Sequence, residues 1–216
     1  MRDAGGALVY HGRGANLRSR RTPLAGISME NRMNTIDAQA SSLVLVDYQA
    51  RLMPAIPGSV EVTANALLLA RAARLLEVPV IGTEHNAEHL GPSLEALAAL
   101  CDRVLPKTHF GACADGLPAM LDAAGTGRPQ VVIAGCEAHV CLLQTALGLL
   151  DAGRRVFVVE NACGARRPSD HAAAMRRLAQ AGATVVTHEM VLFEWLADCR
   201  HPRFREVLAL VKAAPP

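Results

Sequence analysis

Aromatic residues are scarce in this chain of 216 residues, at 3% of the total, and neither sign of charge dominates it. A surface on which the bases of single-stranded nucleic acid stack needs more aromatic side chains than this. The 22 basic residues are balanced by 20 acidic ones, for a net charge of +2, so a basic stripe along a phosphate backbone is not expected either. Nucleic acid is therefore not an expected partner.

Long apolar runs and closely paired cysteines are missing as well. No run approaches the roughly 20 residues that a membrane span needs, and Gly, Arg and His interrupt the N-terminus where a secretory signal has its apolar core. The six cysteines form no Cys-x-x-Cys pair and are too sparse for a disulfide scaffold. We expect no contact with a membrane and a cytoplasmic protein with reduced thiols.

The composition supports one domain with a sizeable core, because 51% of the residues are hydrophobic and 19% are charged. Residues 1–38 show neither the period of a helix nor that of a strand, and residues 1–32 hold six Arg against two acidic residues. We expect residues 1–38 to be a flexible extension and residues 39–212 to form the domain. A targeting segment, and translation from Met29 or Met33, stay open as alternatives.

Apolar runs typical of buried strands alternate with helical patterns from residue 41 onward. The strands are expected at Leu43–Val46, Val78–Thr83, Arg103–Leu105, Val131–Ala134, Val156–Val159 and Thr184–Thr187. The helices are expected at Val60–Glu77, Leu94–Leu100, Gly116–Ala124, His139–Ala152, Ser169–Ala181 and Val207–Lys212. This alternation predicts an α/β fold: a single doubly wound, mostly parallel six-stranded sheet with helices on both faces.

Ligands of such a sheet bind beyond the carboxyl ends of its strands, and three reactive residues are expected there. Asp47 ends the first strand, Lys107 follows the third, and Cys141 lies in the first turn of the helix that follows Gly135. Backbone amides and the helix dipole at that turn favour a thiolate and can also donate to an oxyanion. Taken singly, each residue also fits a structural role, as a buried thiol, a helix cap or a surface lysine. Together they predict a nucleophile with an acid–base partner and an orienting cation.

Three stretches that carry these residues occur in order: Leu43–Gln49, Pro106–Phe110 and Gly135–Cys141. With them the sequence resembles the isochorismatase-like cysteine hydrolase family. Gly82-Thr83-Glu84-His85 and the Glu137–Cys141 run resemble the isochorismatase-domain-containing subgroup of that family.

The resemblance implies a Rossmann-like sheet and a triad of Asp47, Lys107 and Cys141. In this family pattern Asp47 takes the thiol proton and passes it to the leaving group, while Lys107 lowers the pKa of Cys141. A cis peptide bond is implied between Cys136 and Glu137, with the amides of Glu137 and Cys141 directed at the oxyanion. The implied reaction is hydrolysis of a small amide or related acyl substrate through a thioester on Cys141. The resemblance also implies a homo-oligomer.

Candidates for the substrate pocket lie in and around the same stretches. They are Gln49, Glu84, His85, Phe110 and His139. We expect no cofactor, because the first strand is not followed by the glycine-rich turn of a nucleotide-binding fold.

Two other functions stay open. Nicotinamidases of this family bind a metal through Asp and His residues after the second strand, where this chain has Glu84, His85 and His89 without the Asp-x-His pattern. No metal is therefore expected, and a metal-dependent nicotinamidase is the second interpretation. The third is a family member that acts through interaction or redox sensing without catalysis. The sequence does not fix the substrate.

Overall fold

The computed structural model describes residues 35–125 and 127–213. Most of the predicted extension, residues 1–34, lies outside the described residues. Ile36 is 1% exposed and belongs to the core, and its N–H donates to Glu194 Oε2 over 2.7 Å. The Asp37 N–H donates to Gln130 Oε1 over 2.8 Å. The packed body therefore starts earlier than the predicted boundary at residue 39, because Ile36 fills a place in the core.

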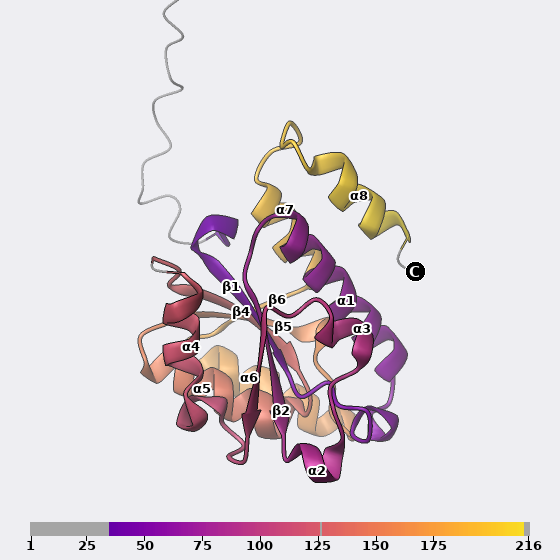
Figure 1. Ribbon diagram of the computed structural model, residues 1–216, viewed down its shortest axis with the longest axis vertical. Helices are drawn as coiled ribbons and strands as arrows, with labels where there is room; N and C mark the ends of the chain where they lie inside the picture. Colours follow the sequence, from indigo (N-terminus) through magenta and orange to yellow (C-terminus); the bar gives the residue numbers. More distant parts are fainter. Residues whose placement is uncertain (1–34, 126, 214–216) are drawn as a thin grey trace, which may run out of the picture. The chain divides into compact units, whose positions relative to one another are not determined.

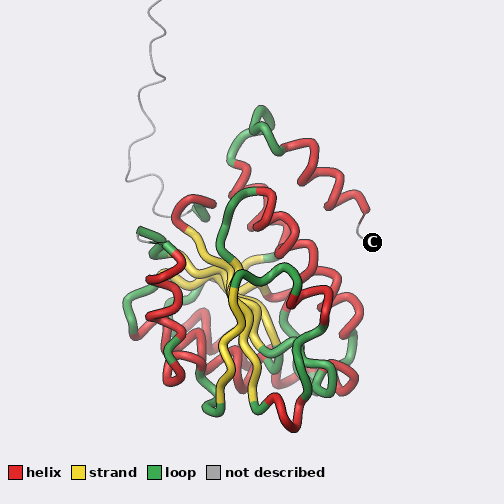
Figure 2. The backbone as a smooth tube through the Cα atoms, viewed as in Figure 1, coloured by secondary structure: helices red, strands yellow, loops and turns green. Residues whose placement is uncertain are grey.

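The predicted α/β fold is confirmed, with a sheet in which all the described strands are parallel. The strands are β1 (Ser41–Val46), β2 (Val80–His85), β3 (Arg103–Lys107), β4 (Gln130–Gly135), β5 (Arg155–Val159) and β6 (Thr184–Val186). They lie in the order β3-β2-β1-β4-β5-β6 and form the central layer in Figures 1 and 2. In this doubly wound order, β2 and β3 are added on one side of β1, and β4, β5 and β6 on the other. Such folds bind ligands at the switch point, here between β1 and β4.

Helices cover both faces of the sheet, as predicted. They are α1 (Ser59–Leu75), α2 (Ala87–Leu90), α3 (Glu95–Ala98), α4 (Leu117–Ala124), α5 (Leu143–Asp151), α6 (Pro168–Gln180), α7 (His188–Leu196) and α8 (Phe204–Ala213). Helices α1, α7 and α8 pack together on one face, and α4, α5 and α6 lie on the other (Figure 1). None of the described helices is both long and apolar enough to cross a membrane.

The central strands explain the apolar runs of the sequence. Every residue of β1 and of β4 is buried, so both faces of these strands are covered by helices and both need small or apolar side chains.

Two strands end two residues later than predicted, and both differences affect the site. Strand β2 continues to His85 and strand β3 to Lys107, because these residues pair in register as Glu84 with Pro106 and His85 with Lys107. Because three of these four residues are polar, they do not continue the apolar runs from which the strands were predicted.

The predicted helix from His139 also differs. Residues Ala138–Leu142 form a π-helical turn, and the α-helix proper begins only at Leu143.

Candidate active site

Asp47 leaves β1 with its backbone in the left-handed region, at φ 53°, which Asp tolerates better than most residues. Its side chain has no exposed surface and is held on both oxygens. Oδ1 accepts the hydroxyl of Thr83 over 2.6 Å, and Oδ2 lies 2.8 Å from Lys107 Nζ. These two partners fix the buried carboxylate in place.

Lys107, the last residue of β3, has a fully buried side chain. Besides Asp47, its ammonium group donates to the backbone carbonyls of His109 over 3.3 Å and Phe110 over 3.1 Å. With Asp47, these two carbonyls hold the ammonium group in place. The turn after β3 therefore fixes the cation that faces Asp47.

Cys141 lies in the π-helical turn that follows β4 and is 6% exposed. Its thiol is within hydrogen-bonding reach of both the Asp47 carboxylate and the Lys107 ammonium group. The carboxylate, the ammonium and the thiol come from the carboxyl ends of three different strands and meet at one edge of the sheet. This meeting point is the candidate active site.

The expected low pKa of this thiol is not what the surroundings produce. The pKa of Cys141 is raised to about 12, mainly by burial and then by the nearby Asp47 carboxylate, whereas Lys107 acts to lower it. The effect of Lys107 does not outweigh desolvation at this buried position. Cys141 is therefore a protonated thiol at neutral pH, next to a carboxylate that can accept its proton.

The turn between β4 and Cys141 is built on close backbone contacts. A Cβ on Gly135, whose φ is 155°, would lie 2.3 Å from the carbonyl oxygen of Val46, so only glycine fits there. The next peptide bond, Cys136–Glu137, is cis, at the position that the family resemblance implies. In the described part of the chain, the Glu137 N–H donates to no backbone carbonyl, so it can donate to a ligand.

The segment after β5 supports this turn. The Ala138 N–H donates to the Gly164 carbonyl over 2.7 Å, and the Gly164 N–H donates to the Gly135 carbonyl over 3.2 Å. The Glu137 carboxylate accepts the backbone N–H of Arg166 over 3.2 Å and its guanidinium Nε over 2.9 Å. The segment after β5 thus holds in place Glu137 and Ala138, which precede Cys141 in the turn after β4.

Gln49 does not line a pocket. Its side chain is fully buried and forms hydrogen bonds with the backbone of His85, the last residue of β2, and of Gly91. Glu84 accepts the N–H of Ser93 over 2.7 Å. Because side chains alternate along a strand, Glu84 also points to the opposite face from Thr83 and its hydrogen bond to Asp47.

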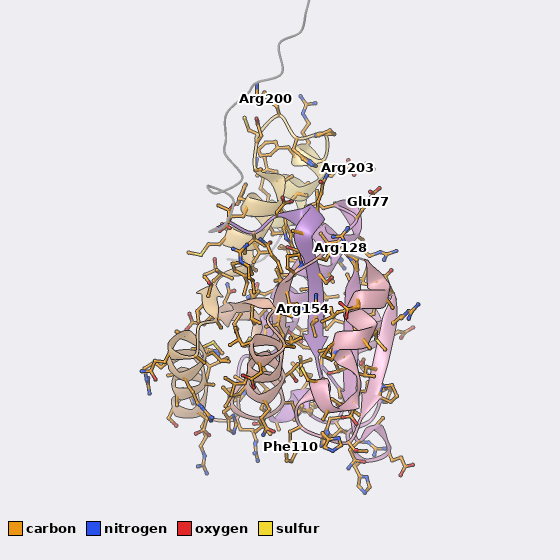
Figure 3. All side chains as sticks on the ribbon, turned by 90° about the vertical axis from the view of Figure 1, so that its left-hand side faces the viewer. Glu77, Phe110, Arg128, Arg154, Arg200 and Arg203 are labelled. Atoms are coloured by element: carbon orange, nitrogen blue, oxygen red, sulfur yellow. The ribbon has the colours of Figure 1, made fainter. Side chains whose placement is uncertain are left out.

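The other three predicted pocket residues, His85, Phe110 and His139, lie at or after the carboxyl ends of β2, β3 and β4. The rings of His85 and Phe110 pack against each other, with centroids 5.1 Å apart and a tilt of 38°. Phe110 is 50% exposed and lies at the carboxyl end of the strands, remote from Arg128 and Glu77 in Figure 3. His139 is partly buried on the π-helical turn, with Nε2 3.8 Å from Asp170 Oδ2.

The residues weighed as metal ligands do not converge. Glu84 is bound by Ser93, His85 packs on Phe110, and His89 is exposed, with Nδ1 3.1 Å from Asn86 Oδ1. Over residues 35–125 and 127–213 there is no group of three or more His, Cys, Asp or Glu side chains suited to a metal. A nicotinamidase-type metal site does not fit these side chains.

Two residues of the site were missed by sequence reasoning. Thr83, which donates to Asp47, lies on the same strand face as His85, and this alternation was the available signal. Arg166, which binds Glu137, lies 29 positions along the chain from it, and no local pattern in the sequence links the two.

Comparison with known proteins matches this arrangement to one family. The model of the isochorismatase domain matches residues 41–190. Isochorismatase domain-containing protein 2 of Pongo abelii is 37% identical over 180 residues, which cover 82% of this chain and 85% of that protein.

Solved structures agree. A MAR1 ribonuclease from Caenorhabditis elegans superposes with a TM-score of 0.78 at 31% identity, over 84% of this chain and 95% of that one. YcaC from Pseudomonas aeruginosa, solved with hexane-2,5-diol and covalent acrylamide, gives 0.76 at 28% identity, over 82% and 92%. YcaC from Escherichia coli, described as an octameric hydrolase of unknown specificity, gives 0.72 at 25% identity, over 84% and 98%.

Proposed function

This chain belongs to the isochorismatase family of hydrolases, and from that premise we propose that it is a cysteine hydrolase of small amides or related acyl compounds. One observation carries the proposal. The thiol of Cys141 lies within hydrogen-bonding reach of a carboxylate and an ammonium group that are themselves 2.8 Å apart and buried. These three groups are a nucleophile, a proton acceptor and a fixed cation, which is what acyl transfer to sulfur requires.

The first step is attack by a protonated thiol, because burial raises the pKa of Cys141 to about 12. The Cys141 proton passes to the Asp47 carboxylate as the sulfur bonds to the substrate carbonyl carbon. Such positioned proton transfer contributes roughly 10²- to 10⁴-fold to a rate. Lys107 holds Asp47 in place through their ion pair.

Collapse of the tetrahedral intermediate releases the amine, which takes the proton from Asp47 and leaves a thioester on Cys141. Water then attacks the thioester carbon and gives its proton to Asp47. The second collapse releases the carboxylic acid and returns the proton to the Cys141 sulfur. The backbone N–H groups of Glu137 and Cys141 are the proposed donors to the oxyanion in both steps.

One similar structure supports a small amide as a ligand of such a site. YcaC from Pseudomonas aeruginosa was solved with covalent acrylamide, a small amide.

The proposal is tested by a screen of purified protein against small amides, carbamates and esters, with Cys141→Ala as the blank. The exposed Cys199 provides the matched control, because Cys199→Ala removes a thiol far from the triad without touching the site. We expect turnover of at least one amide by the wild type and by Cys199→Ala, and none by Cys141→Ala. Turnover that survives in Cys141→Ala contradicts the mechanism.

Ribonuclease activity is the second candidate, because the Caenorhabditis elegans structure at 31% identity carries that name. The same screen therefore includes single-stranded RNA. Cleavage of RNA by both the wild type and Cys141→Ala, without amide turnover, favours this candidate over the cysteine hydrolase.

We also propose that the chain forms a homo-oligomer. The support is the octameric state named for YcaC from Escherichia coli. Sedimentation velocity of the full chain at several concentrations measures the copy number, and a monomer at all of them contradicts the proposal.

A further inference from the structure

The side-chain amide of Gln49 forms hydrogen bonds with both the backbone N–H and the backbone carbonyl of His85. Gln49 Oε1 accepts the His85 N–H over 2.9 Å, and Nε2 donates to the His85 carbonyl over 3.1 Å. The same Nε2 donates to the Gly91 carbonyl over 2.6 Å. Gln49 is fully buried, so these hydrogen bonds are not exchanged with water. The backbone that carries the His85 ring is therefore fixed.

The ring itself is fixed from the other side by Phe110, whose centroid lies 5.1 Å away. Phe110 in turn is tied to the triad, because its carbonyl accepts Lys107 Nζ over 3.1 Å. The imidazole of His85 is thus attached to the buried ion pair through one intervening residue.

The direction of the His85 side chain follows from strand register. His85 pairs with Lys107, and Thr83 pairs with Leu105, in the parallel ladder of β2 and β3. Thr83 donates to Asp47, so its side chain points to the triad, and His85, two residues further along β2, points to the same face. The imidazole therefore faces the side of the sheet on which the triad meets.

One nitrogen of this fixed ring has no partner. Nδ1 of His85 is buried, and none of the described residues offers it a hydrogen bond. An unpaired buried polar atom is costly, and native structures keep few of them outside sites that bind a ligand. His139 also has an unpaired Nδ1, but its Nε2 is directed toward Asp170 on α6.

We propose that His85 is a substrate-binding residue whose Nδ1 accepts a hydrogen bond from the N–H of a carboxamide held at Cys141. This deepens the proposed function, on which it rests, by naming the substrate class: small amides that carry an N–H, in preference to esters of the same shape. A site with a buried acceptor rejects a molecule that lacks the matching donor, because the acceptor then stays unpaired.

Two reagents of matched shape test this without any knowledge of the natural substrate. Acrylamide carries the carboxamide N–H, methyl acrylate lacks it, and both alkylate a thiol at the same carbon. The second-order rate constants for alkylation of Cys141 are measured by intact-protein mass spectrometry, with glutathione as the reference for intrinsic reactivity. The readout is the rate constant for acrylamide divided by the rate constant for methyl acrylate. This ratio for the protein is then divided by the same ratio for glutathione.

We expect His85→Ala to lower this ratio roughly 3- to 10-fold, which corresponds to one neutral hydrogen bond. His85→Asn, whose side-chain oxygen reaches the position of Nδ1, should keep most of the ratio. His85→Phe, which keeps a ring against Phe110 but has no nitrogen, should lower it, and this variant serves if His85→Ala fails to fold. His89→Ala is the matched control, because His89 is exposed on the neighbouring α2.

An unchanged ratio in His85→Ala and His85→Phe overturns the proposal. Equal loss of both rate constants overturns it as well, because His85 then acts on the thiol or on the fold and not on the amide. Failure of the proposed function looks different: the wild type hydrolyses no amide in the screen, whether or not the alkylation ratio depends on His85.

Discussion

Lys107 Nζ and Asp47 Oδ2 lie 2.8 Å apart, and neither side chain has any exposed surface. A charge pair buried to this degree is stable only while both members are present, since the loss of one leaves the other unpaired and out of contact with water. The same two residues therefore take part in the proposed reaction and stabilise the fold.

Replacing Lys107 by Met should lower the free energy of unfolding by about 3–5 kcal/mol, because the buried Asp47 carboxylate then has no cation beside it. Asp47→Asn should cost a similar amount. The double variant should be much less destabilised than the sum of the two, since it leaves no unpaired charge. Urea unfolding of the four proteins measures the coupling, and strictly additive losses contradict it.

Alkylation of Cys141 by iodoacetamide should be slow at neutral pH and should rise with pH without a plateau below about pH 10, because the pKa of this thiol is raised to about 12 by burial and then by Asp47. Asp47→Asn should lower the pKa and speed alkylation at pH 8, while it abolishes hydrolysis. Cys141→Ala gives the background from other thiols. A wild-type midpoint below pH 8 contradicts the raised pKa.

The folded protein should lose stability in alkaline solution. Burial raises the pKa of Cys136 and of Cys141 to about 12, whereas an unfolded thiol titrates near pH 8.5. Groups with a raised folded pKa stabilise fully below the unfolded pKa, and that contribution is lost as pH rises toward the folded pKa. The urea concentration at the midpoint of unfolding should therefore decrease as the pH is raised from about 9 to about 11. Cys136→Ala should show a shallower fall than the exposed-site control Cys199→Ala.

Gly135→Ala should be far more damaging than Gly164→Ala. The new Cβ at Gly135 meets the Val46 carbonyl oxygen at 2.3 Å, a backbone atom within the sheet. At Gly164 it meets the Ile56 Cγ2 methyl at 2.5 Å and the Cys136 sulfur at 3.0 Å, both on side chains that can shift. We expect the about 1–3 kcal/mol of ordinary overpacking for Gly164→Ala and more for Gly135→Ala. Thermal unfolding of both variants measures the difference, and equal losses contradict it.

Most of the fold could be predicted from the sequence, because buried parallel strands require continuous apolar runs and the helices between them have their own period. The run Leu43–Val46 is the clearest case. The ends of β2 and β3 could not be predicted in this way, since His85 and Lys107 are polar and join the sheet only through their pairing with each other.

The triad residues could be selected because each follows a strand, and the carboxyl ends of parallel strands meet at one edge. Their energetics could not be read in the same way. The pKa of Cys141 is a balance of burial, Asp47 and Lys107, and burial is a property of the folded chain alone. The role of Gln49 was likewise hidden, because the backbone groups that it binds lie 36 and 42 residues further along the chain.

Val46 and Gly135 are register partners in the ladder of β1 and β4, and each immediately precedes a residue or turn of the site. The distance between Asp47 and the turn that carries Cys141 is therefore set by the pairing of two central strands. An exposed side chain beside the site, such as that of Phe110, can be exchanged without moving either group, because both are placed by the sheet. Substrate choice can therefore change while the distance between acceptor and sulfur is kept.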